Sequence, residues 1–113
     1  MIDIYSGNDD QILPILSLGG KGVISVLSNV APKYTHDMVM SYLQGDTSKA
    51  TKMQLDCIDL VHSLFCEVNP IPVKAALNMM CMEAGGYRPP LVEMDQADMD
   101  ALEKSMRSFG LIK

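Results

Sequence analysis

The order of its local patterns constrains this chain most: two short β-prone runs stand at the start, and only helical patterns follow. The β-prone runs are residues 2–6 and 23–27, and the segment between them, residues 11–18, has helical character. The second run is mostly apolar, which is typical of a parallel strand covered on both faces. The start of the chain is therefore predicted to be a β-α-β unit.

The apolar residues after Asn29 recur with helical spacing up to the C-terminus. We expect four helices, over residues 32–44, 47–65, 73–82 and 95–109, with Gly45 and Gly110 at two of the helix ends. Two parallel strands cannot by themselves satisfy both edges of a sheet. The pattern therefore predicts a helix-dominated α/β fold that is the end of a larger α/β protein.

Composition excludes several classes of partner. The 113 residues carry nine Lys and Arg against fourteen Asp and Glu, a net charge of −5, so a nucleic-acid partner is not expected. No apolar run approaches the ~20 residues that cross a bilayer, and the first residues, Met1-Ile2-Asp3, do not look like a secretion signal. We expect a soluble, cytoplasmic protein that contacts no membrane.

Neither a metal nor a cofactor is expected from the motifs. The three cysteines form no CxxC pair, and buried free thiols in a reducing compartment are the preferred interpretation. His62 and Cys66 share a helix face but lack further ligands at metal-binding spacing. The run Gly19-Gly20-Lys21-Gly22 lacks the earlier glycine and the Ser or Thr of a phosphate loop. We interpret that run as a helix stop followed by a close approach to the next strand.

Three phrases in fixed order carry a family resemblance. They are Tyr5-Ser6-Gly7-Asn8-Asp9, then Gly19-Gly20-Lys21-Gly22-Val23-Ile24-Ser25-Val26 with Asn29-Val30, and then Asn69-Pro70-Ile71-Pro72-Val73-Lys74. Together they closely resemble the C-terminal part of the dihydrodipicolinate synthases, in the N-acetylneuraminate lyase superfamily. The resemblance covers nearly the whole chain.

The resemblance implies a (β/α)8 barrel followed by a three-helix C-terminal domain. Because such a barrel needs ~250 residues, residues 1–45 would be its last two β/α units and residues 46–113 the helical domain. The family is implied to be a homo-oligomeric lyase of lysine and diaminopimelate biosynthesis. In it, pyruvate forms a Schiff base with a lysine of the sixth strand and then condenses with aspartate semialdehyde.

The resemblance also assigns candidate site residues. Gly7 matches a glycine whose backbone lies close to the second substrate, and Ile24 matches an isoleucine whose backbone carbonyl faces the pyruvate-bearing lysine. The structural alternatives are that Gly7 only shapes a turn and that Ile24 only fills a barrel layer. Lys21 and Lys74 do not match the Schiff-base lysine, and the tyrosines of the proton relay are absent, so this chain would hold no catalytic residue.

Three hypotheses follow for the chain as a whole. The first is a fragment of a dihydrodipicolinate synthase that is inactive alone. The second is a fragment of another pyruvate-dependent class I aldolase of the superfamily. The third is a non-catalytic helical module that oligomerises. Unpaired strand edges at residues 2–6 and 23–27 further predict that the isolated chain is not a monomer.

Overall fold

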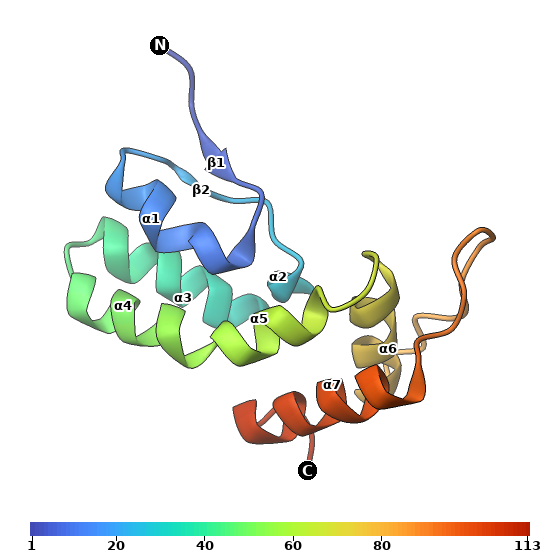
Figure 1. Cartoon of the computed structure of the whole chain (residues 1–113). Coiled ribbons are helices and arrows are strands. Elements are labelled where there is room, and N and C mark those ends of the chain that lie inside the picture. The colour runs from blue at the N-terminus through green and yellow to red at the C-terminus, as the bar shows by residue number, and fades with distance from the viewer. The chain divides into compact units, whose positions relative to one another are not determined.

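The computed structural model describes all 113 residues and contains one pair of strands, a 3₁₀ helix and seven α-helices, which confirms a helix-dominated α/β protein. It divides into two compact units, residues 1–58 and 59–113, each of which is described by itself. The first unit holds both strands and the helices α1 to α4, and the second holds α6 and α7 (Figure 1). None of the helices combines the length and the apolar character that crossing a bilayer requires.

Two strands, β1 (Tyr5–Ser6) and β2 (Gly22–Val23), pair in parallel, with Tyr5 opposite Gly22 and Ser6 opposite Val23. The pairing is longer than these strands, because the Lys21 amide donates to Ile4 O and the Ile24 amide to Ser6 O, each at 2.8 Å. The expected parallel β-α-β unit is confirmed. The sheet has no third strand, so each strand has one outer edge unpaired.

The connection between the strands explains the glycine-rich run. A 3₁₀ helix, η1 (Asp9–Gln11), leads into α1 (Ile12–Ser17), which ends where Gly19 adopts the left-handed φ of +93°. A Cβ on Gly20 would lie 2.5 Å from Cγ2 of Ile15 and 2.7 Å from its carbonyl oxygen. The interpretation of this run as a helix stop with a close backbone approach is confirmed.

The second strand is shorter than the sequence predicts. Residues 23–27 were expected to form it, but pairing stops after Ile24, and α2 (Leu27–Val30) begins instead. The reason is that the amides of Val26 and Leu27 donate to the Asp9 carboxylate, at 2.9 and 3.0 Å. The side chain of Asp9, in η1, thus turns the backbone out of the sheet.

The first unit is completed by α3 (Pro32–Leu43) and α4 (Thr47–Asp56), joined at Gly45, whose φ is +93°. Asp46 caps α4 by accepting the Lys49 amide at 3.1 Å. The core of the unit consists of side chains that are almost completely buried: Ile12, Leu16, Leu27, Val30, Met38, Ala50 and Cys57.

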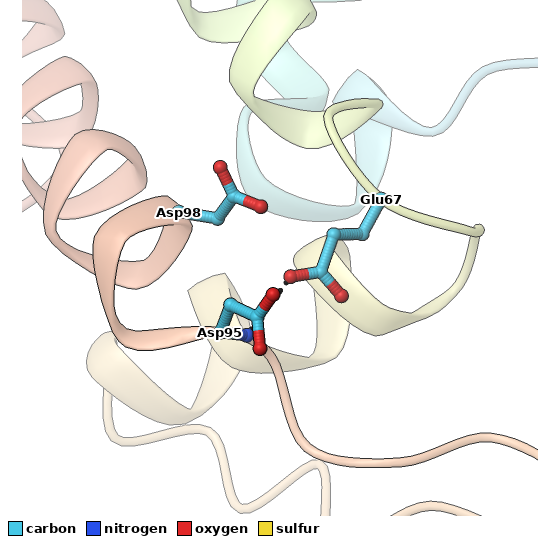
Figure 2. A group of neighbouring side chains, drawn as sticks. All are labelled: Glu67, Asp95 and Asp98. Carbon is cyan, nitrogen blue, oxygen red and sulfur yellow. Dashed lines mark hydrogen bonds between the residues drawn. The ribbon is translucent and has the colours of Figure 1, made fainter.

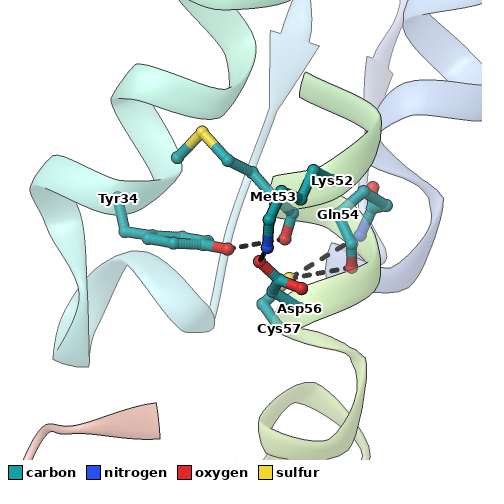
Figure 3. Close-up of polar contacts among 6 residues, drawn as sticks. All are labelled: Tyr34, Lys52, Met53, Gln54, Asp56 and Cys57. Carbon is teal, nitrogen blue, oxygen red and sulfur yellow. Dashed lines mark hydrogen bonds and ion pairs between the residues drawn. The ribbon is translucent and has the colours of Figure 1, made fainter. Parts of the chain in front are cut away.

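The expected single helix over residues 47–65 is wrong, because α4 ends at Asp56 and α5 (Ile58–Leu64) begins after Cys57. The Tyr34 hydroxyl donates to the Met53 carbonyl at 2.7 Å, and the Cys57 amide reaches the same oxygen only at 3.2 Å (Figure 3). A side chain that inserts into a helical hydrogen-bond ladder is a recognised cause of a helix break.

The second unit holds α6 (Ile71–Met79) and α7 (Gln96–Phe109), which pack together. The break at residues 69–72 is confirmed, but α6 begins at Ile71 rather than at Val73, because Pro72 is accepted in a first helical turn. Gly110, with φ of +92°, ends α7 as expected. The core of the second unit consists of buried apolar side chains, those of Leu60, Val61, Leu64, Ile71, Ala76, Leu102 and Met106.

Candidate functional site

The carboxyl ends of the two parallel strands bring the candidate residues together. Gly7 follows the last residue of β1, and Ile24 follows the last residue of β2. The Ile24 amide donates to the carbonyl of Ser6, the residue before Gly7. Both candidates therefore lie at the same edge of the sheet, the one formed by the carboxyl ends of the strands. In barrels of alternating strands and helices, this is the edge where active sites lie.

Both candidates are open to solvent. Gly7 is exposed, and a Cβ added to it would meet no atom within 4 Å. Neither a positive φ nor a close neighbour in this chain requires glycine at position 7. The Ile24 side chain is 73% exposed, and so it fills no packed layer within this chain.

A network of buried polar groups stands directly behind this edge. The Asp9 side chain is completely buried, and its carboxylate accepts the Ser25 hydroxyl in addition to the Val26 and Leu27 amides. The buried Gln54 of α4 donates through Nε2 to the Asp9 carbonyl at 2.9 Å and accepts the Leu13 amide at 3.1 Å. Every polar side-chain atom of the network therefore has a partner.

The sequence named Asp9 only as part of a family phrase and indicated no role for Gln54. The Asp9 carboxylate instead acts sixteen residues or more along the chain, on the turn after β2. No spacing rule indicates this contact. The Ser28 amide in turn donates to Ser25 Oγ, at 2.9 Å.

Lys21 and Lys74, neither of which was expected to be the Schiff-base lysine, lie in different units of the chain. Lys21 precedes β2 and is exposed at the amino end of the strand pair, opposite to Ile24. Lys74 lies on α6 in the second unit, where its ammonium donates to the Gly86 carbonyl and stands 5.5 Å from the Tyr87 ring centroid. Lys21 therefore does not stand at the carboxyl end of the strands.

The cysteines differ from expectation in their exposure. Cys57 is completely buried, and burial, with the charges of Asp9 and Asp56 adding to it, raises its pKa to about 11. Cys66 and Cys81 are exposed, so the expectation of buried thiols is wrong for both. Cys66 follows α5 and Cys81 follows α6, outside the apolar face of either helix.

One acidic cluster occurs in the second unit. Carboxylate oxygens of Glu67, Asp95 and Asp98 lie within 4.8 Å of one another (Figure 2). Glu67 accepts the Asp95 amide at 2.9 Å, and Asp95 and Asp98 stand at the start of α7, where the helix dipole favours negative charge. The Glu67 hydrogen bond and the helix dipole thus account for the cluster.

The chain is a helix-dominated α/β protein that begins with a parallel β-α-β unit. An open glycine and an exposed isoleucine stand at the carboxyl ends of its two strands. Within that class, the family model described as "Dihydrodipicolinate synthetase family" matches residues 1–108. The chain belongs to this family.

Named relatives agree. The chain is 55% identical over 111 residues to 4-hydroxy-tetrahydrodipicolinate synthase 1 of Clostridium acetobutylicum. The matched region covers 98% of this chain and 38% of that protein. It matches the dihydrodipicolinate synthase of Thermotoga maritima with a TM-score of 0.95 at 40% identity, over 97% of this chain and 37% of the other.

A third match is to the chloride-inhibited dihydrodipicolinate synthase of Acinetobacter baumannii complexed with pyruvate. It has a TM-score of 0.93 at 33% identity, over 98% of this chain and 38% of the other. The chain thus spans less than two fifths of the length of the relatives it matches.

Proposed function

We propose that the chain forms the C-terminal part of a 4-hydroxy-tetrahydrodipicolinate synthase. The observation that carries the proposal is the 55% identity to a synthase over 98% of the chain. Residues 1–45 then form the last two β/α units of a (β/α)8 barrel, and residues 46–113 its helical domain. The parallel pair β1–β2, with α1 crossing between the strands, supports this assignment.

The complete enzyme condenses pyruvate with aspartate semialdehyde. A lysine amine attacks the pyruvate ketone, water leaves, and an imine forms. Loss of a methyl proton gives the enamine, whose carbon attacks the aldehyde of the second substrate. This chain supplies no amine for the first step, since Lys21 lies at the amino end of the strands and neither Lys21 nor Lys74 matches the Schiff-base lysine of the family.

Gly7 and Ile24 are the substrate-facing positions that the chain contributes. The open space around Gly7 lets a ligand approach the main chain. Ile24 acts through its backbone carbonyl, while its amide stays in the strand ladder with Ser6. Because Gly7 and Ile24 lie at one edge, the second substrate and the pyruvate adduct can meet there.

A hybrid enzyme tests the proposal. The segment of the Clostridium acetobutylicum synthase 1 that this chain matches is replaced by residues 1–113. We expect the hybrid to form a borohydride-trappable pyruvate adduct and to condense it with aspartate semialdehyde. The 113-residue chain alone, as the control, should form no adduct. A hybrid that is folded but forms no adduct overturns the proposal.

The same hybrid separates the alternatives. An adduct that does not react with aspartate semialdehyde indicates another pyruvate-dependent aldolase. Gly7→Val should lower the efficiency toward the second substrate on the order of 10²-fold, since a 1 Å misplacement has effects of that size. Ile24→Val should stay within about three-fold, because the lost methylene costs only ~1 kcal/mol of packing. The opposite ranking would remove Gly7 from the site.

The enzyme is further proposed to be a cytoplasmic homo-oligomer. Its three cysteines are free, which suits a reducing compartment. Exposed apolar side chains lie along β1 and the turn after α1, namely Ile2, Ile4, Tyr5 and Leu18. Sedimentation velocity at micromolar concentration should show dimers or larger species for the 113-residue chain, and a single monomeric species would refute this.

A further inference from the structure

Asp9 is a buried carboxylate outside the positions assigned to substrate. It follows the open loop at Gly7 and Asn8, yet its own side chain is completely buried. Burying an ionised carboxylate is costly unless hydrogen-bond donors surround it. Here three donors do so: the Ser25 hydroxyl on Oδ1, and the Val26 and Leu27 amides on Oδ2 at 2.9 and 3.0 Å.

These donors belong to the three residues immediately after Ile24. On the other side, the Ile24 amide donates to Ser6 O at 2.8 Å. The peptide group that joins Ile24 to Ser25, and that contains the Ile24 carbonyl, is therefore held from both directions. Ser28 adds rigidity, because its amide donates to Ser25 Oγ and its hydroxyl to Ser25 O, both at 2.9 Å.

Asp9 is itself anchored. Gln54 of α4 donates to the Asp9 carbonyl at 2.9 Å and accepts the Leu13 amide at 3.1 Å. On the other side of Gly7, the Ser6 hydroxyl donates to the Asn8 carbonyl at 2.7 Å. A continuous set of hydrogen bonds thus runs from α4, through Asp9, to the backbone that follows Ile24.

We propose that Asp9 is a positioning residue for the condensation, because its carboxylate fixes the direction of the Ile24 carbonyl. The inference rests on the proposed function. A carbonyl dipole stabilises developing charge only if it is aimed before the reaction begins. Asp9 fixes that direction from η1 without touching the substrate.

Two substitutions of Asp9 in the hybrid enzyme separate positioning from mere burial. Asp9→Ala leaves the Ser25 hydroxyl and the Val26 and Leu27 amides without their acceptor. Asp9→Asn keeps one oxygen for both amides and can donate to Ser25 Oγ. We expect Asp9→Ala to lower kcat on the order of 10²-fold while the KM for pyruvate changes by less than about three-fold, since the pyruvate-binding lysine is untouched.

Rescue is the second measurement. Asp9→Asn should recover kcat to within about ten-fold of the unsubstituted hybrid, because one charge-assisted hydrogen bond changes by roughly that factor. Ser25→Ala, which removes one of the three donors to Asp9 and also the acceptor of the Ser28 amide, should lower kcat by a few-fold. Met106→Ala is the matched control: it opens a cavity at a fully buried side chain of α7, in the other unit, and should leave kcat unchanged below its melting transition.

The outcomes are distinct. An Asp9→Ala hybrid that keeps kcat within three-fold, or a Met106→Ala hybrid that loses as much kcat as Asp9→Ala, overturns the inference. If Asp9→Ala does not fold, Asp9→Asn and Ser25→Ala decide: full kcat in both overturns it. An unsubstituted hybrid without a pyruvate adduct overturns the proposed function and the inference with it, whereas an active hybrid insensitive to Asp9 overturns the inference alone.

Discussion

Replacing Gln54 by Met should remove the support for the junction between η1 and α1. Gln54 is only 6% exposed. Its side-chain amide accepts a hydrogen bond from one backbone amide, that of Leu13, and donates one to a backbone carbonyl, that of Asp9. Met has nearly the same length and fills the same space, but it can neither accept the Leu13 amide nor donate to the Asp9 carbonyl. The substitution therefore tests hydrogen bonding with little change in volume.

The magnitude follows from the two groups left unsatisfied. Each buried backbone group that loses its partner costs about 1–3 kcal/mol. Gln54 also donates at 3.8 Å to the Cys57 sulfur (Figure 3), a weak contact that adds little. We expect the free energy of unfolding to fall by about 3 kcal/mol. With a urea m value of about 2 kcal/mol/M, the midpoint moves down by about 1.5 M.

Urea unfolding followed by far-ultraviolet circular dichroism measures the effect. Gln44→Met is the matched control, because it makes the same change at an exposed residue after α3 and should stay within about 0.5 kcal/mol of the parent. If Gln54→Met unfolds within 1 kcal/mol of Gln44→Met, the Gln54 amide does not carry the junction, and the reasoning from buried polar groups fails.

Three further results are expected. With a thiol reagent at pH 8, we expect Cys66 and Cys81 to react in the folded chain and Cys57 to react only in urea. The reason is that Cys57 is buried and that burial raises its pKa to about 11. Fast labelling of all three cysteines without urea would contradict this. Because the folded pKa of Cys57 lies above its unfolded value of 9.0, the folded state holds its proton more tightly. The Cys57 contribution to the free energy of unfolding should therefore be constant below pH 9 and fall by about 2–3 kcal/mol as the pH rises to 11. Cys57→Ala should remove this part of the pH dependence, while Tyr34, whose pKa burial raises to about 12, adds a fall of its own above pH 10. Gly20→Ala should destabilise the chain by about 1–3 kcal/mol, because its Cβ would lie 2.5 Å from Ile15 Cγ2, while Gly7→Ala, with open space around it, should be neutral; equal unfolding midpoints would refute the close approach at Gly20.

The parts of the fold that local chemistry decides could be predicted. Helix ends at Gly19, Gly45 and Gly110 follow from the left-handed backbone that glycine adopts readily, and each has φ near +93°. The parallel order of the strands follows from the helix between them. The Asp46 cap of α4 is equally local, because its partner lies three residues away.

Long-range contacts decided the rest. Nothing near residues 23–27 indicates that the strand stops after Ile24, because the acceptor for Val26 and Leu27 is Asp9. Similarly, the break at Cys57 depends on the Tyr34 hydroxyl, nineteen residues before Met53 in the chain. Helical periodicity records only which residues are apolar, so it cannot show where a distant polar side chain competes for a carbonyl group.

The candidate site, too, has one part that could be predicted from the sequence and one part that could not. Gly7 and Ile24 were named from the resemblance, and the structure places them at one edge of the sheet, while their roles toward substrate stay predictions. The boundary after residue 45, the expected end of a barrel, also stays a prediction. The division of the chain into two compact units falls after Ile58 instead. The polar network behind the edge joins residues up to 45 positions apart, beyond the reach of spacing rules.

The unpaired outer edges of β1 and β2 set up a competition between two kinds of encounter. Pairing with a second copy is bimolecular, so its rate rises with protein concentration. Pairing with strands carried on the same polypeptide is unimolecular and corresponds to an effective concentration on the order of millimolar. At micromolar protein, the tethered strands therefore win by a factor of about 10³. Whether these edges close a barrel or nucleate an aggregate is thus a matter of covalent continuity, not of the sequence of the edges themselves.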